Sequence, residues 1–271
     1  MDEREELDTA TGTEKQRNKR GKFIRSRLNV SFLIALATLL AIWFVAAHAV
    51  DKPFQFPRLE SVLSELGYAF TDLYVWRNLG ITFRRVLLGV LYATLIGFPL
   101  GMFMGYSKTA MKTISPFIAA LRQIPMTSWV PLSIIWFGLG DGPSIFVIAL
   151  VAVFTIILST VSGVKDISPE YYNAVRSMGA TTAGVIKDVV FPGCISGLIT
   201  GMRIAFGLAW MTVVCAEFIA TSTGFGFLIK QAHQDMITQR MIAYMLMAGI
   251  FGFAQDRVVL FAESRLLRWK G

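Results

Sequence analysis

Six apolar stretches, each about as long as a hydrocarbon layer is thick, dominate the sequence. They cover roughly residues 31–50, 80–105, 114–138, 143–163, 196–220 and 240–262. An α-helix rises 1.5 Å per residue, so about 20 residues cross the roughly 30 Å of bilayer hydrocarbon. Backbone polar groups in hydrocarbon must be bonded within the segment, which favours a helix for each stretch. The sequence therefore predicts an all-α integral membrane protein with six transmembrane helices.

The first stretch, SFLIALATLLAIWFVAAHAV, could also be the core of a secretory signal. It is long for a signal, and the DKPFQFP that follows it has no small-x-small cleavage site. We therefore expect an uncleaved first span. A content of 54% hydrophobic and 16% charged residues agrees with a membrane protein. Residues 1–30 are predicted to form a cytoplasmic tail, and residues 31–271 to form the six-span domain.

The distribution of Lys and Arg predicts how the spans are oriented. If the N-terminus is cytoplasmic, the inside segments hold 17 of the 26 Lys and Arg residues and the outside segments hold seven. Cytoplasmic loops carry an excess of these residues, so both termini are expected inside. This orientation also places residues 164–195 in the cytoplasm.

The sequence lacks the motifs of several other classes. It contains no G-x-x-x-x-G-K-[ST] phosphate loop, and its net charge of +8 comes without a zinc, helix-turn-helix or RNA-binding signature. Cys194 and Cys215 have no metal-ligand spacing, and His48 and His233 have no cluster of carboxylates or thiols near them in sequence. We expect no catalysis, no metal site, no ATP site and no nucleic-acid partner in this chain.

The segment 164–195 reads as two short water-facing helices between two spans. Ser168 and Pro169 form a helix start, which predicts a first helix over 169–178. Gly179 can end that helix in the left-handed conformation, and Thr181 can cap a second helix that stops before Pro192. Each helix has an apolar stripe: Tyr171, Val175 and Met178 on the first, and Ile186, Val189 and Val190 on the second. The stripes could pack on the protein's own spans or receive another protein.

This segment resembles the loop that marks the permease subunits of binding-protein-dependent ABC importers. The pattern of that loop is E-A-A, three residues, G, nine residues and then I-x-L-P. Ala174, Gly179 and Pro192 match it, while Asn173 stands in place of the usual Glu and Val175 in place of the second Ala. The Asn weakens any inference of a salt bridge from position 173 to the ATPase.

A second segment, LRQIPMTSWVPLSIIWFGLG, is similar to the third span of nitrate, taurine and alkanesulfonate permeases. The family-like core covers about residues 76–265. The resemblance implies a type I ABC importer permease (MetI-like architecture) with cytoplasmic coupling helices, in a bacterial inner membrane. It implies a second permease copy, two ATPase subunits that bind ATP and Mg²⁺, and an external solute-binding protein. The implied ATPase-coupling residues are Tyr171, Asn173, Ala174, Val175, Met178, Gly179, Ile186 and Pro192.

The implied cargo is a small anion such as a sulfonate, taurine or nitrate, although another small organic solute stays open. Its path is expected where Pro125 and Pro131 interrupt the third span, because irregular backbone at membrane depth must line a cavity or be covered by protein. A plain kinked helix is the alternative. Arg122 is a candidate for anion attraction or for pairing with freed carbonyls, and Trp129 for lining the path or anchoring at the interface. Glu217 is a candidate gate residue or a partner in an ion pair across a dimer.

Gly97, Gly101 and Gly105 recur every four residues, with Gly89 two turns earlier, and predict close helix packing.

Two other functional classes are alternatives to the importer. A self-contained channel or secondary transporter predicts inverted repeats or a charged relay, and a membrane enzyme predicts clustered His, Asp or Glu. The sequence has neither feature.

Overall fold

A computed structural model describes residues 34, 35, 37–50, 52 and 54–268, in which every regular element is helical. The predicted tail lies outside these residues. The chain divides into two units, residues 1–61 and 62–271. In the first unit, an apolar helix covers Ala37–Val50. The indole Nε1 of Trp43 donates to the Pro57 carbonyl at 3.2 Å, so this helix is tied to the turn that follows it.

The labelled helices follow one another with short connections. They are α2 (Leu59–Thr71), α3 (Leu73–Tyr106), α4 (Lys108–Arg122), α5 (Met126–Phe137), α6 (Asp141–Lys165), α7 (Pro169–Ser177), α8 (Thr182–Val185), a π-helical turn (Ile186–Val190), α9 (Phe191–Ala220), α10 (Phe225–Gln234) and α11 (Thr238–Leu266). The all-α prediction is confirmed.

Among the described residues, four continuous helical segments are long and apolar enough to cross a bilayer: Leu73–Tyr106, Asp141–Lys165, Thr182–Ala220 and Thr238–Leu266. The predicted third span, 114–138, is not one helix. It is divided between α4 and α5, and α5 with 12 residues is only about 18 Å long. The predicted number of six full-length spans is therefore not reproduced as six long helices.

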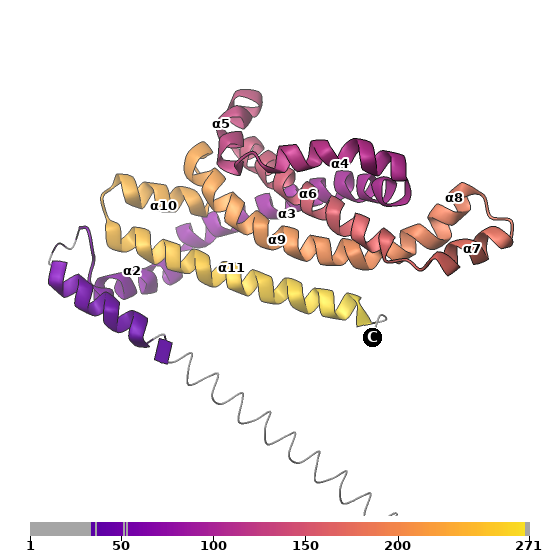
Figure 1. Cartoon of the computed structure of the whole chain (residues 1–271). Helices are drawn as coiled ribbons and strands as arrows, with labels where there is room; N and C mark the ends of the chain where they lie inside the picture. Colours follow the sequence, from indigo (N-terminus) through magenta and orange to yellow (C-terminus); the bar gives the residue numbers. More distant parts are fainter. Residues whose placement is uncertain (1–33, 36, 51, 53, 269–271) are drawn as a thin grey trace, which may run out of the picture. The chain divides into compact units, whose positions relative to one another are not determined.

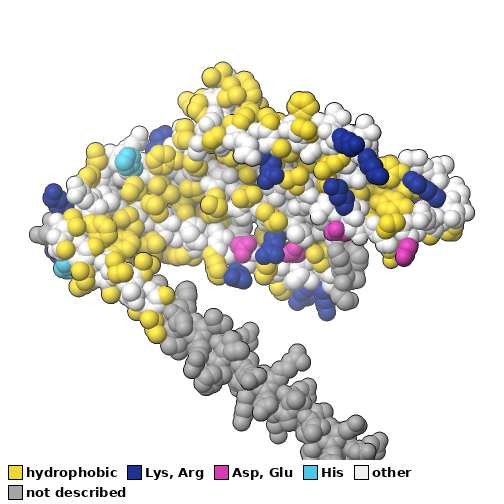
Figure 2. All heavy atoms as spheres, in the orientation of Figure 1, with side chains coloured by type: hydrophobic (Ala, Val, Ile, Leu, Met, Phe, Trp, Pro, Cys, Tyr) yellow, Lys and Arg dark blue, Asp and Glu magenta, His cyan; other side chains and the backbone are white. Residues whose placement is uncertain are grey.

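Within residues 62–271, α6 packs along its length between α3 and α9 (Figure 1). In the same view α7 and α8 lie at one end of this bundle and α10 lies at the other. Figure 2 shows a largely hydrophobic surface over the middle of the bundle and several Lys and Arg side chains toward the α7–α8 end. This face is thus mainly apolar over the bundle, with Lys and Arg side chains gathered toward the α7–α8 end and scattered elsewhere.

The glycines of α3 form its contact with α6, as the sequence predicted. A Cβ at Gly101 would lie 2.8 Å from the Thr160 Cβ and 2.9 Å from the Ile157 carbonyl oxygen, and a Cβ at Gly89 would lie 2.7 Å from the Ile148 Cβ. These distances leave no room for a side chain. Small residues therefore bring the two backbones together, which is how membrane helices gain packing energy when lipid is as apolar as their side chains.

The second helix of the cytoplasmic pair does not stop before Pro192, which corrects the prediction. α8 continues through the π-helical turn directly into α9, and Pro192 lies in the first turn of α9. Proline has no N–H, and its ring disturbs the carbonyl four residues earlier. The wider turn, in which the Phe191 N–H donates to the Ile186 carbonyl, lets the helix pass this position without ending.

The seam between α3 and α6 predicts a contrast between two glycines of α3. Gly101→Ala should lower the free energy of unfolding by about 1–3 kcal/mol, because the methyl group overpacks against Thr160 and Ile157. Gly80→Ala is the matched control, since nothing lies within 4 Å of its Cβ position, and it should be neutral or slightly stabilising. Thermal unfolding of the two variants in detergent measures the difference, and equal midpoints would contradict the close contact.

Candidate functional site

The segment between α6 and α9 ends the bundle with two short, well-capped helical pieces. The Ser168 Oγ accepts from the Glu170 N–H at 3.4 Å at the start of α7, and the Thr181 Oγ1 accepts from the Gly184 N–H at 3.3 Å at the start of α8. Gly179 has a φ of +82°, the left-handed conformation that ends α7. The start and stop signals in the sequence predicted these local structures.

The inner side of this helix pair packs on the bundle. Val185 and Val190 join Val164 and Cys194 in a buried cluster, with half-buried Val175 against it. Tyr172 also packs here, with its ring centroid 6.5 Å from that of Tyr106, and burial raises the pKa of its hydroxyl above the ordinary value. The inner contacts fix the pair to the ends of α3, α6 and α9.

The outer side carries apolar side chains that this chain does not cover. Met178 is 86% exposed and Tyr171 is 65% exposed, and Ile186 is exposed as well. Asn173, Ala174, Gly179 and Pro192, the other residues predicted to couple, are also exposed. Of the predicted coupling residues, only Val175 turns inward. The outer surface, defined here by Tyr171, Met178 and Ile186, is a knob of apolar side chains at the tip of the bundle.

The backbone breaks between α4 and α5, as Pro125 predicted. α4 ends at Arg122, and Pro125 has the extended angles φ −56° and ψ 133° before α5 begins. Pro131 lies inside α5 and does not interrupt it. Arg122 is exposed at the end of α4, and no carboxylate lies within ion-pair distance of it in the described part of the chain.

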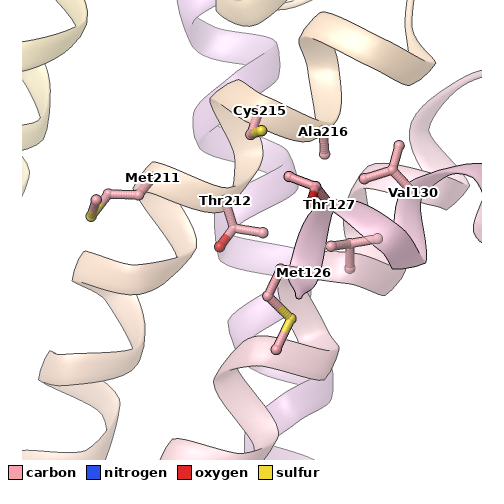
Figure 3. Close-up of a pocket in the computed structure, with 8 residues that line it drawn as sticks. Met126, Thr127, Val130, Met211, Thr212, Cys215 and Ala216 are labelled. Atoms are coloured by element: carbon pink, nitrogen blue, oxygen red, sulfur yellow. The ribbon is translucent and has the colours of Figure 1, made fainter. Parts of the chain in front are cut away.

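A cavity of about 180 Å³ lies beside this break, between α5, α6 and α9. Figure 3 shows its lining side chains from α5 and α9, which carry hydroxyl, thioether and thiol groups but no charge. Its lining residues are Met126, Thr127, Val130, Val147, Met211, Thr212, Cys215 and Ala216. None of the five predicted path residues (Arg122, Pro125, Trp129, Pro131 and Glu217) lines it. Trp129 packs nearby, against a cluster that contains Val130 and Ala216.

Glu217 instead lies in a buried ion pair at the opposite end of the bundle from α7. The side chains of Arg85 and Glu217 are 1% and 0% exposed, and Arg85 Nη1 lies 2.7 Å from Glu217 Oε1. Arg85 Nε donates to Asp141 Oδ1 at 2.8 Å, and the Thr82 hydroxyl donates to Glu217 at 2.9 Å. The pair therefore forms within one chain and joins α3, α6 and α9.

The same network holds the amino end of α10. The N–H of Gly226 donates to Glu217 Oε2 at 2.9 Å, and the N–H of Phe225 donates to the Thr82 hydroxyl at 2.8 Å. The N–H of Gly224 donates to Asn78 Oδ1 at 2.7 Å. These first N–H groups have no partners inside the helix, so the distant side chains act as its caps.

Glu217 was predicted as a site residue, whereas Arg85 and Asp141 were not. Arg85 is 132 residues from Glu217, so no local spacing connects them. One signal was available, because an arginine inside an apolar helix requires a partner, and the few acidic residues inside or beside the spans are its candidates. Pairing Arg85 with Glu217 on this basis would have placed α3 beside α9.

The ion pair predicts a sharp difference between neighbouring arginines. Arg85→Met should lower the free energy of unfolding by about 3–5 kcal/mol, because it leaves the buried Glu217 carboxylate without its cation. Glu217→Met should lower it less, because Arg85 keeps its bonds to Asp141. The double variant should lose less than the sum of the two. Arg84→Met is the matched control: Arg84 is 61% exposed and pairs with Asp141, and an exposed pair contributes about 0–1 kcal/mol. Additive losses in a thermal or denaturant double-mutant cycle would contradict the pairing.

The chain is similar to known proteins over most of its length. Residues 97–268 match the family of binding-protein-dependent transport system inner membrane components. An ABC transporter permease protein of Methanocaldococcus jannaschii is 34% identical over 92% of this chain and 97% of its own length. The taurine transport system permease TauC of Escherichia coli is 32% identical over 87% of this chain and 88% of its own.

The fold is also that of a solved permease. A structure of the MetNI methionine ABC transporter in an inward-facing conformation aligns with a TM-score of 0.63, at 18% identity, over 72% of this chain and 95% of the other. The expected MetI-like architecture is thereby confirmed. The chain belongs to the binding-protein-dependent transport system inner membrane components, and it is the multi-pass, non-catalytic permease subunit of such a system.

Proposed function

We propose that this permease forms half of the translocation path of an ATP-driven importer for a small anion, with the α7–α8 knob as the surface that its ATPase drives. The observation that carries the proposal is the exposed apolar tip formed by Tyr171, Met178 and Ile186 at one end of the family's bundle. An apolar surface at the tip of a membrane bundle favours a protein partner. ATP and Mg²⁺ belong to that partner.

The charge distribution supports a cytoplasmic position for the knob and for both termini. Lys165, Arg176 and Lys187 lie in or beside α7 and α8, and Lys108 lies where α4 begins. The positive-inside rule places such an end in the cytoplasm. α10 and the Arg85–Glu217 pair are then on the external side, where a solute-binding protein delivers the cargo.

Movement of the knob is transmitted to the membrane helices through the buried cluster beneath it. When two ATPases close on ATP, the knob of each permease copy moves with its ATPase, and Val185, Val190 and Cys194 pass that movement to α6 and α9. The chain itself needs no chemistry for this step. It needs only a coupling free energy between the closed ATPase and the outward-open bundle, about 1–3 kcal/mol for ordinary allostery.

The cargo is proposed to pass through the cavity between α5, α6 and α9, which we call the Cys215 cavity after one of its lining residues. Relatives named for taurine, nitrate and aliphatic sulfonate transport support a small oxyanion. The Thr127 side chain gives the cavity a hydroxyl group, and no carboxylate in its lining repels an anion. A second copy of the chain is proposed to complete the path, because the α9 side chains beside the cavity, such as Met211, are exposed in one copy.

Replacement of Gly179 tests the coupling. Gly179→Val should abolish co-purification of the ATPase, or reduce solute-stimulated ATP hydrolysis at least tenfold, since a β-branched residue does not adopt φ +82° at low cost. Gly179→Asn is the matched control, because Asn tolerates the left-handed region, and it should keep most of the activity. Nothing lies within 4 Å of the Cβ position, so conformation and not space decides the outcome. An unaltered ATPase interaction in Gly179→Val would overturn the proposed role of the knob.

Cys215 offers a test of the path. The other cysteine of the chain, Cys194, is buried, so a thiol reagent reaches Cys215. Modification with a sulfonatoethyl methanethiosulfonate should reduce uptake in vesicles at least tenfold, because it leaves a fixed anion in the cavity. The smaller methyl reagent should reduce uptake less, and a Cys215→Ala variant should resist both. Full modification of Cys215 with undiminished uptake would place the path elsewhere.

A further inference from the structure

A second, acidic cavity lies at the α10 end of the bundle, remote from the knob. Its volume is about 170 Å³, and it opens between the end of α2, the start of α3, the last turn of α10 and the start of α11. It is lined by Tyr68, Asp72, Tyr74, Leu228, Gln231, Ala232, Asp235, Arg240 and Tyr244. Asp72 precedes α3, whose last residue, Tyr106, packs beside α7. The 34 residues of α3 separate the two ends by about 50 Å.

The charges around this cavity leave a net negative site. Arg240 is already neutralised, because its Nε lies 2.9 Å from Glu65 Oε2 and its Nη2 lies 3.5 Å from Oε1. Asp235 has no ion-pair partner among the described residues. Asp72 accepts one backbone N–H, from Tyr74 at 2.8 Å, and forms no ion pair there either. Two carboxylates thus remain without a cation.

The helix ends modulate this charge. Gln231, Ala232 and Asp235 belong to the last turn and C-cap of α10, where the helix dipole adds negative potential. Asp72 is the N-cap of α3 and is partly offset by the positive end of that helix. The α10 side of the cavity therefore attracts a cation more strongly than the α3 side does.

Three tyrosines complete the lining, and one of them has an unused hydroxyl. Tyr244 is 7% exposed and lines the cavity, and its hydroxyl makes no hydrogen bond to any residue the structure describes. This hydroxyl is open to the cavity, so it can bond to a ligand there. Tyr68 and Tyr74 are exposed at the opening. Aromatic faces together with carboxylates are the surroundings that ammonium and guanidinium groups prefer.

We propose that this acidic cavity receives one Lys or Arg side chain of the external solute-binding protein and so positions that protein over the path. This inference rests on the proposed function, which places α10 outside and gives the system a binding protein. The cavity volume suits a single side chain and not a protein segment.

The neighbouring network gives the cavity a rigid wall. α10 is held at its amino end by Asn78, Thr82 and Glu217, and its C-terminal turn forms the cavity. A binding protein seated there contacts the helix that is capped from α3 and α9. Docking would therefore act on the elements that border the path, without a flexible loop between them.

The experiment uses the complete transporter in liposomes and the solute-binding protein that stimulates its ATP hydrolysis. The double variant Asp72→Asn, Asp235→Asn should raise the concentration of binding protein needed for half-maximal stimulation about tenfold, with little change in the maximal rate. Asn keeps the N-cap of α3, so the fold is retained. Glu60→Gln, on an exposed carboxylate of α2 that does not line the cavity, is the matched control and should leave that concentration unchanged.

A second variant guards against a purely structural effect. Tyr244→Phe removes the unused hydroxyl and leaves the ring, so it should raise the half-maximal concentration about threefold at unchanged thermal stability. Higher salt should shrink the difference between the unmodified protein and the Asp variant. A change in the half-maximal concentration of solute, in place of that of the binding protein, would make the cavity a solute station and overturn the proposal.

The outcomes separate this inference from the function on which it rests. If the binding protein stimulates every variant with the same half-maximal concentration, the docking site is wrong and the importer stands. If no binding protein stimulates ATP hydrolysis by the unmodified transporter, both fail.

Discussion

The close contact of α6 with α3 and α9 is the interaction on which the other features depend. A hydrocarbon solvent supplies no hydrophobic force between helices, so the contact is made by small residues that admit neighbouring backbones. On the α9 side, a Cβ at Gly197 would lie 2.6 Å from the Ser159 carbonyl oxygen. The Arg85–Glu217 pair joins these three helices at one end, and the cluster with Val164 and Cys194 joins them at the other.

The two ends of this core use different physics for the same purpose. The α10 end is held by charges and hydrogen bonds, which are directional and leave no unpaired group at Glu217. The α7–α8 end is held by apolar side chains and leaves Met178 uncovered. Directional bonds fix one geometry, while an apolar contact allows a small shift without breaking a bond. The end proposed to receive the ATPase is thus the end with the tolerant interface.

The sequence predicted the features that depend on residues close together in the chain. Four of the six predicted spans, the caps of α7 and α8, the break at Pro125 and the glycine seam all follow from periodicity, turn residues and spacing along one segment. The misses depend on distant partners. α10 was not predicted because its caps come from the distant side chains of Asn78, Thr82 and Glu217. The helix that continues through Pro192 was not predicted because it depends on a π-helical turn, which no simple sequence pattern indicates. The path residues chosen from the sequence were the conspicuous ones, whereas the cavity is lined by ordinary Thr, Met and Cys side chains.

The uncharged lining of the Cys215 cavity affects how selective the permease can be. A site that binds an anion tightly needs a charged or multiply hydrogen-bonded group, as Arg provides. The Cys215 cavity has none, and Thr212 already donates its hydroxyl proton to the Leu208 carbonyl at 2.8 Å. A solute that crosses such a cavity is solvated weakly and leaves easily, which conduction requires. Under the proposed function, solutes are discriminated before the membrane, by the protein that delivers them, and the permease contributes by accepting that protein in one orientation.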